Sequence, residues 1–297
     1  MTQTERVKTA ILKALRDIPS PPVVLNEYLP FHLLLLDRNQ TTVPSLVLYL
    51  LSIFSKAVIN AFVGECAVNT KAAEPVGTLA AQIFSLPELQ YRRNIPSIDS
   101  NNHHDHASGG DARMPPMTPD SVSLITILIC KFHAAAPILF GISGPENTPA
   151  GRLRLGWRRD FAKEGDQQKS FVLEQRQYDR LTGLGAGYAS LALRNFSKAR
   201  LTNPFPPINF WQSLAWIVNT EPEEVNVSQL ILLKSMLENN AVDRFVLFFG
   251  AAAVAALKEA LVGFPRKLPR SVAEKPAAKS LALLAETFKK ERNFSLS

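Results

Sequence analysis

The sequence predicts an all-α fold, on three observations. Apolar residues recur at helical spacing along most of the 297 residues. Convincing runs of alternating apolar and polar residues are absent, as are the Asn-Gly and Asp-Gly dipeptides typical of tight hairpins. Short Pro-rich turns separate the helical segments, many of which are apolar on more than one face. We therefore expect residues 1–297 to form a single elongated domain, a HEAT-like helical solenoid of stacked helix pairs without a fixed-period repeat.

Each element is expected from its own pattern. Residues 220–223 and 271–274 fit the capping-box signature, a Ser or Thr followed three residues later by Glu. Residues 203–207 and 263–265 combine Gly, Asn and Pro and mark helix ends. The expected helices span residues 3–16, 24–37, 45–64, 72–86, 120–136, 168–200, 207–219, 222–241, 242–262 and 271–292.

One segment interrupts the helices. Residues 96–120 are rich in Ser, Asn, His, Gly, Asp and Pro and have no apolar periodicity, so we expect a flexible inserted loop. His103, His104, Asp105 and His106 could bind a metal ion, but a loop without regular structure supplies no hydrogen bonds to orient such ligands. We expect no metal site there.

The most apolar stretch, residues 44–63, is long enough to be considered as a membrane span. Ser52, Lys56 and Asn60 lie four residues apart and place a polar stripe along one face. Because a lysine at mid-depth in lipid costs several kcal/mol, we interpret the stretch as a buried helix of a soluble domain. Cys66 and Cys130 lie in apolar helical patterns without metal-binding spacing, and are expected to be reduced core residues of an intracellular protein.

The charge of the chain is unevenly distributed. Residues 151–200 contain eleven Lys and Arg against five acids, which accounts for nearly all of the net charge of +7. Such a bias predicts either a surface that binds a polyanion or an acidic partner, or a solvated basic face without a ligand. Trp157 and Phe161 are the only aromatic residues beside these arginines that suit base stacking.

The sequence offers no catalytic motif. Residues 183–187 read Gly-Leu-Gly-Ala-Gly, but they follow a polar helical segment, and Tyr188 stands where a dinucleotide-binding fingerprint needs a small residue. We interpret these glycines as sites of close helix packing. A phosphate loop, a GxSxG elbow and an HExxH pair are all absent, and His32 and His133 can each be core histidines. The chain is therefore expected not to be an enzyme.

Three stretches resemble one protein family. Residues 129–137 read ICKFHAAAP and resemble a helix ending in a Cys-Pro or Ala-Pro turn. Residues 178–188 read YDRLTGLGAGY and resemble the family's R-x-x-G-x-x-x-x-Y/F helix. The most specific element is Asn-Pro at 203–204 followed by FWQSLAWIVNTEP at 210–222. Over about residues 45–295 the chain is similar to the C-terminal domain of the GLFG-lethal (Gle) mRNA-export factors of filamentous fungi.

The resemblance implies a function. It implies a HEAT-like domain at the cytoplasmic face of the nuclear pore complex, in a protein of the cytoplasm and nucleus that serves transport and translocation of mRNA. Such a domain stimulates the ATPase cycle of a DEAD-box RNA helicase, with inositol hexakisphosphate as a tether, and binds a segment of an FG-repeat nucleoporin. The family's coiled-coil region is absent, so Met1 is expected to begin an excised domain. The alternative is a helical adaptor that binds RNA directly through the basic surface.

The candidate binding residues follow from this reading. Arg194, Lys198 and Arg200 are expected to end helix 168–200, with two of them four residues apart on one face and all near its negative dipole end. Lys56 matches a lysine in the family's first helix, and either Lys131 or His133 faces the ligand. The full inositol-phosphate set is Lys56, Lys131, His133, Arg194, Lys198 and Arg200.

Partner-binding residues are expected in two further places. Arg152 and Arg154 begin a second basic patch with Arg158 and Arg159, which we assign to an acidic partner surface or to plain solvation. The C-terminal helices, about 222–292, are assigned to the nucleoporin segment, because one helix is apolar almost all round. Its candidate contact residues are Phe245, Val246, Phe248, Phe249 and Val254.

Overall fold

The computed structural model describes residues 22–24, 42–92, 121–160 and 170–292, together with a few isolated positions before residue 14. Within these ranges most residues lie in helices, as expected. The expected loop 96–120 and the expected helices 3–16 and 24–37 lie outside the described residues for all or most of their length.

The helices are joined by connections of different lengths, of which those before and after α8 (Glu174–Ala192) are long. The longer ones are α3 (Ser45–Val63), α5 (Ala73–Phe84), α6 (Thr126–Ala135), α8 (Glu174–Ala192), α9 (Ile208–Val218), α10 (Val227–Leu237) and α15 (Pro276–Arg292). Shorter ones are α4 (Glu65–Val68), α7 (Pro149–Arg154), α11 (Ala241–Phe249), α12 (Ala251–Lys258), α13 (Phe264–Arg266) and α14 (Arg270–Ala273). A π-helical turn at Glu259–Gly263 joins α12 to α13.

Two short antiparallel strand pairs accompany the helices. β1 (Pro22–Val24) pairs with β2 (Thr42–Pro44), and β3 (Gln90–Arg92) pairs with β4 (Ser121–Ser123). The second pair occupies the start of the expected helix 120–136, which therefore begins only at Thr126. Side-chain alternation over three residues is too short for a sequence pattern to reveal.

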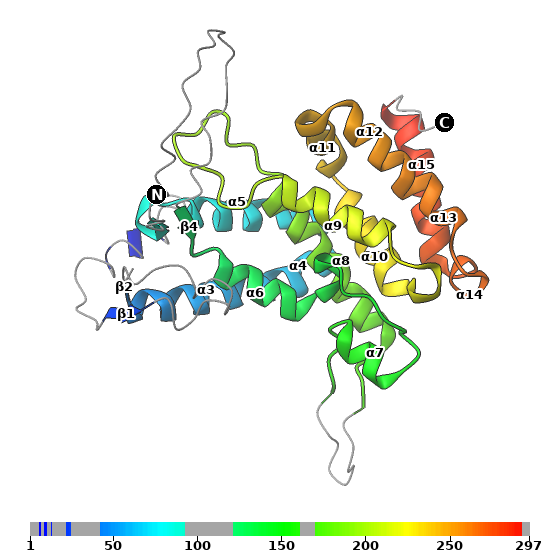
Figure 1. Cartoon of the computed structure of the whole chain (residues 1–297), viewed down its shortest axis with the longest axis horizontal. Helices are drawn as coiled ribbons and strands as arrows, with labels where there is room; N and C mark the ends of the chain where they lie inside the picture. Colours follow the sequence, from blue (N-terminus) through cyan, green and yellow to red (C-terminus); the bar gives the residue numbers. More distant parts are fainter. Residues whose placement is uncertain are drawn as a thin grey trace, which may run out of the picture.

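Helix α8 is central to the molecule. Figure 1 places it between a group formed by α3, α5 and α6 and a second group formed by α9 to α15. Every residue from Gly183 to Ala192 is buried. A Cβ atom on Gly183 would lie 1.9 Å from the carbonyl oxygen of Phe62, and one on Gly185 would lie 2.9 Å from that of Leu232. The interpretation of these glycines as close-packing sites is thus confirmed: they let α3 and α10 approach α8 from different sides.

Several helix ends differ from the expectation, each for a local reason. α10 begins at Val227, because Asn226 and Gln229 form the capping box that closes its first turn. At the expected box, the Thr220 hydroxyl donates to the Trp216 carbonyl instead. Expected helix 242–262 is divided at Gly250, whose φ of 55° lies in the region that favours glycine. Ser271 lies inside α14 and caps nothing.

The apolar helix α3 packs one face inward. Its buried residues include Leu51, Ser55 and Phe62, whereas Lys56 and Asn60 of the polar stripe are exposed. By length and composition, Ser45–Val68 is a described helical stretch that could cross a membrane. Its outer face also exposes Tyr49, and only 33% of its most apolar stretch is buried, so the expectation of a buried helix is wrong. Cys66 is buried as expected, but Cys130 is exposed, which corrects its assignment to the core.

Candidate interaction sites

The inositol-phosphate candidates occupy three parts of the fold. Lys56 is exposed on α3, and α6 carries a half-buried Lys131 and an exposed His133. The imidazole of His133 lies 5.1 Å from the ring of Phe140, centroid to centroid. His133 is therefore a surface residue rather than a core histidine. α3 and α6 lie side by side (Figure 1), so these three candidates are on neighbouring helices.

The remaining three candidates, Arg194, Lys198 and Arg200, do not end a helix. α8 stops at Ala192, and the following segment to Ile208 is irregular. The expected spacing of Arg194 and Lys198 on one helical face is wrong, because the chain leaves the helix before either residue. The side-chain amide of Asn203 donates to the Arg194 carbonyl at 3.2 Å, so the two ends of this segment lie close together. Lys198 and Arg200 are exposed.

Arg194 is already paired with a carboxylate. Its Nη2 lies 2.8 Å from Oε2 of Glu74 at the start of α5, and Arg244 of α11 donates to both oxygens of the same carboxylate. Burial alone would raise the pKa of Glu74, but Arg244 and Arg194 outweigh it and lower that pKa below its usual range. The two guanidiniums and one carboxylate leave a single net positive charge at the junction of α5, α8 and α11.

The second basic patch is also divided. Arg152 points inward: Nε donates to the Glu146 carbonyl at 2.9 Å, Nη2 lies 3.2 Å from Glu174, and the guanidinium stands 4.5 Å from the centroid of Trp157. Arg154, by contrast, is exposed. α7, which carries both, was missed from the sequence, although the Thr148 hydroxyl and Pro149 form an ordinary helix start.

Arg180 corrects the idea of one basic surface over residues 151–200. It is only 6% exposed and donates to the Gly156 carbonyl at 3.0 Å. Burial, with a contribution from Arg158, lowers its pKa to about 10. It has no carboxylate partner among the described residues, and its Nε, like the indole Nε1 of Trp157, is buried without an acceptor there. Arg180 therefore belongs to the interior of the fold.

The apolar C-terminal candidates are mostly packed. Phe245 is fully buried against Phe210 and Trp211, with ring centroids 5.1 Å and 5.4 Å away. Phe248 and Phe249 are half-buried, and their neighbour Leu247 is 68% exposed. Val246 and Val254 are half-buried as well. The outer face of α11 is therefore apolar and partly open, whereas Phe245 is a core residue.

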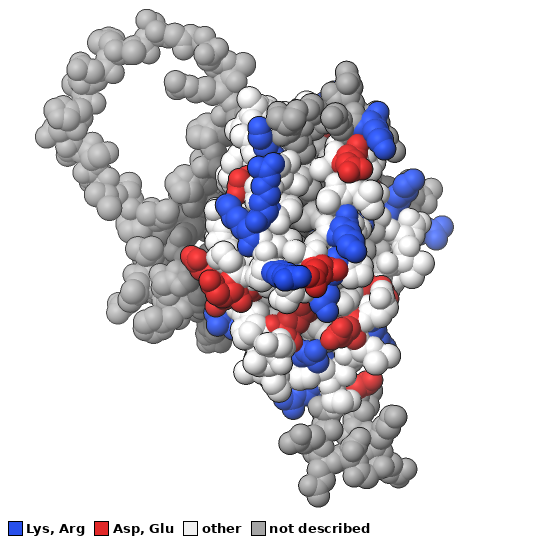
Figure 2. All heavy atoms as spheres, turned by 90° about the vertical axis from the view of Figure 1, so that its right-hand side faces the viewer, with Lys and Arg blue, Asp and Glu red and all other residues white. Residues whose placement is uncertain are grey.

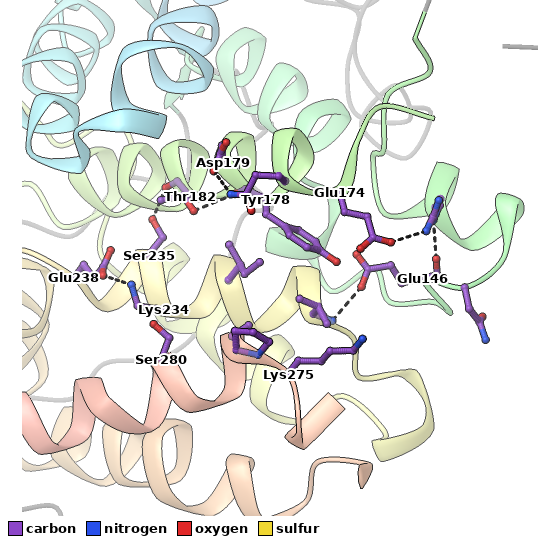
Figure 3. A pocket seen from close by; sticks show the side chains of 17 residues that line it. Glu146, Glu174, Tyr178, Asp179, Thr182, Lys234, Ser235, Glu238, Lys275 and Ser280 are labelled. Carbon is purple, nitrogen blue, oxygen red and sulfur yellow. Dashed lines mark hydrogen bonds and ion pairs between the residues drawn. The ribbon is translucent and has the colours of Figure 1, made fainter. Parts of the chain in front are cut away.

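A groove that the sequence did not predict lies between α8, α10 and α15. It has a volume of about 720 Å³, and Figure 3 shows its polar side chains. Tyr178 of α8 extends into it, with the carboxylates of Glu174 and Glu146 near its hydroxyl. Glu146 accepts hydrogen bonds from the Val227 and Ser228 amides at 3.0 and 3.4 Å and from the Ser228 hydroxyl, so it closes the first turn of α10. The residues of the groove are far apart in the sequence and meet only when the helices pack, so no sequence pattern could indicate it.

Comparison with known proteins identifies relatives. A family model described as GLE1-like protein matches residues 2–261. A Chaetomium thermophilum protein named mRNA export factor GLE1 is 38% identical over 259 residues, which are 87% of this chain and 42% of that protein. The chain thus spans less than half the length of this relative.

Solved structures share the fold. A complex described as the S. cerevisiae Dbp5 C-terminal domain bound to Gle1 and IP6 matches with a TM-score of 0.61 and 19% identity, over 82% of this chain and 69% of that chain. A second complex of the same composition, with a Gle1 variant, matches equally well. At this identity the likeness extends to the fold alone.

Proposed function

Because the chain belongs to the GLE1-like family, we propose that it is an mRNA-export factor that binds a DEAD-box RNA helicase and stimulates its ATPase cycle. The observation that carries this proposal is the 38% identity to a GLE1 export factor over 87% of the chain. The fold shared with a Gle1 that was solved with Dbp5 and IP6 supports it. The site of action is the cytoplasmic face of the nuclear pore complex.

The chain itself supplies no hydrolytic chemistry in this proposal. A DEAD-box helicase must close its two lobes for ATP hydrolysis and open them for product release. A rigid partner that binds one arrangement better shifts that equilibrium. The close packing of α8 against α3 and α10 supports the proposal that the chain acts as such a partner. We also propose that the helices stack as HEAT-like pairs, so that their loops and outer faces form a long contact surface.

Inositol hexakisphosphate acts as the tether between the two proteins. A compact ligand with six phosphates needs several Lys or Arg side chains that can form charge-assisted hydrogen bonds. The exposed cations Lys56, Lys198 and Arg200 have the right chemistry, and none forms an ion pair with a described residue. Arg194 remains in the set, but it must share its guanidinium with Glu74.

An FG-repeat nucleoporin segment binds to the C-terminal helices. The half-buried Phe248 and Phe249 and the exposed Leu247 offer an apolar face on α11 that suits a short peptide. A saturating nucleoporin peptide should raise the melting temperature of the chain. An unchanged melting temperature argues against this part of the proposal.

The proposal is tested by helicase turnover. Purified chain should show no ATPase activity of its own and should raise the turnover of the export helicase, more strongly when inositol hexakisphosphate is present. Intrinsic hydrolysis that survives rigorous purification, or unchanged helicase turnover, contradicts it. Direct RNA binding by the chain in the absence of helicase would favour the alternative, an adaptor that binds RNA through its basic residues.

Calorimetry locates the inositol-phosphate site. Lys56→Ala and Lys198→Ala each remove an exposed side chain, so the fold should persist while the affinity falls several-fold. Arg154→Ala is the matched control, because that arginine is exposed but belongs to the other basic patch. Unchanged affinity in both lysine variants together with loss in Arg154→Ala would place the ligand on the second patch.

A further inference from the structure

The groove between α8, α10 and α15 is lined by acidic, basic and apolar side chains. Its lining includes Tyr178 and Asp179 of α8, Ile231 of α10, and residues 275–277 and 280 around the start of α15. Figure 3 shows Tyr178 on the α8 side and Lys275 and Ser280 on the opposite side. A volume of about 720 Å³ is within the range of sites that bind peptides or small molecules. Of the individually named candidate binding residues the groove contains only Arg152, and it contains none of the apolar residues of α11, although its α10 and α15 walls lie within the range 222–292.

The charges along the groove do not cancel internally. Arg152 is paired with Glu174, and Lys234 with Glu238. Asp179 accepts a hydrogen bond from the Gln175 amide at 2.7 Å and has no cation partner among the described residues. Glu146 is likewise held by backbone amides and a hydroxyl rather than by a cation. Against these two carboxylates stands Lys275 of the opposite wall, which has no ion pair with a described residue.

Two carboxylates, Glu146 and Glu174, and the guanidinium of Arg152 surround the Tyr178 end of the groove. Burial raises the pKa of Tyr178, and the neighbouring charges of Glu146 and Glu174 raise it further, with Arg152 only partly opposing them. Burial also raises the pKa of Glu146, and Glu174 adds to that effect. A positive charge placed beside this tyrosine would be attracted by the carboxylates and by the face of the aromatic ring.

We propose that this groove binds a peptide segment of a partner protein, with an Arg or Lys side chain seated against Tyr178 beside Glu146 and Glu174. Apolar groups of the same segment cover Ile231 and Pro276, which are part of the lining. Lys275 on the opposite wall suits an acidic residue of that segment. Nucleic acid does not suit the site, because its phosphates would meet the carboxylates of Glu146 and Asp179 without a compensating cluster of cations.

The charge requirement can be tested at the level of one side chain. The methyl resonances of Ile231 are followed by NMR while the chain is titrated with N-acetyl-arginine methylamide. The same titration with the citrulline analogue replaces the guanidinium by an uncharged urea of equal size. N-acetyl-glutamate methylamide and a ten-nucleotide oligo-dT are the anionic probes. We expect a saturable shift of the Ile231 methyl resonances with the arginine compound. The citrulline compound should bind about five-fold more weakly or worse, because it lacks one charge contact.

Two variants and a control locate the effect. Glu174→Gln and Asp179→Asn change exposed side chains, so both variants should keep the helical circular dichroism spectrum of the wild type. Each should weaken the binding of the arginine compound about three-fold, as expected for the loss of one exposed charge. Glu286→Gln changes an exposed carboxylate of α15 outside the groove and should leave binding unchanged. Equal binding of the citrulline compound, preference for either anionic probe, or full affinity in both groove variants would overturn the proposal.

Discussion

At the scale of single residues, Glu74 is the most informative position. Its carboxylate joins Arg194, which follows α8, to Arg244 of α11, and all three side chains are largely shielded from solvent. In Glu74→Gln two guanidiniums would face each other without a counter-charge. We expect the free energy of unfolding to fall by about 2 kcal/mol, less than for a fully buried pair because solvent still screens the site. Urea unfolding measures this, and Glu286→Gln, an exposed acid without an ion pair to a described residue, should change little.

The same carboxylate predicts a pH dependence. The pKa of Glu74 is lowered from 4.5 in the folded chain, so folding favours its ionised form. Its stabilising contribution is therefore complete above the unfolded pKa and is lost as the pH falls through the folded pKa. The difference in unfolding free energy between wild type and Glu74→Gln should shrink between about pH 6 and about pH 3. A difference that stays constant over this range would show that Glu74 does not act through its charge.

Residues that depend on tertiary contacts could not be placed from the sequence. The helical pattern of α8 runs directly into the segment that carries Arg194, Lys198 and Arg200. The local sequence contains no signal that the helix ends before Leu193 and that Arg194 turns toward Glu74. Arg180 was counted as a surface charge because burial of a lone arginine is rare. Lys56 is exposed on the polar stripe of α3, and that stripe is a local pattern that the sequence shows by itself.

At the scale of elements, the contact between α8 and α3 depends on a glycine, because a larger residue would not fit between the two helices. A Cβ on Gly183 would lie 1.9 Å from the Phe62 carbonyl oxygen and 2.8 Å from the Ala67 nitrogen, so the backbones must separate. Alanine is the better helix former by about 1 kcal/mol, but overpacking costs about 1–3 kcal/mol and more where backbone must move. Gly183→Ala should therefore lower the free energy of unfolding. Gly185→Ala, whose nearest atom would be 2.9 Å away, should cost less, and the reverse order would contradict this packing.

The helices themselves were largely predictable, and their ends were less so. The spacing of apolar residues located α3, α5, α9 and α10, because amphipathic periodicity extends over many residues. The position of a helix end depends on a single capping residue, and the sequence contains more than one capping-box pattern near the start of α10. Asn226 closes α10, where its side-chain amide also reaches the Gly144 carbonyl at 3.1 Å, while the similar pattern at 220–223 caps no helix. The contact of Asn226 with Gly144 is tertiary, and only the fold reveals it.

At the scale of the whole molecule, α8 connects two groups of helices. It packs on α3, α4 and α5 on one side and on α10 on the other, and the Glu74 cluster adds a second connection from α5 to α11. Separation of either group from α8 would expose the buried residues 183–192. The two groups should therefore unfold together, although chains of this length often show intermediates.

Two core phenylalanines, one in each group, test this coupling. Phe62 is fully buried against Phe132 in the first group, with ring centroids 5.7 Å apart, and Phe245 is fully buried against Phe210 in the second. Phe62→Ala and Phe245→Ala should each cost about 3–5 kcal/mol. Scanning calorimetry should show one transition in both variants, moved to lower temperature as a whole. If Phe245→Ala instead produced a separate early transition and left the remainder at the wild-type temperature, the two groups would be independent units and α8 would not couple them.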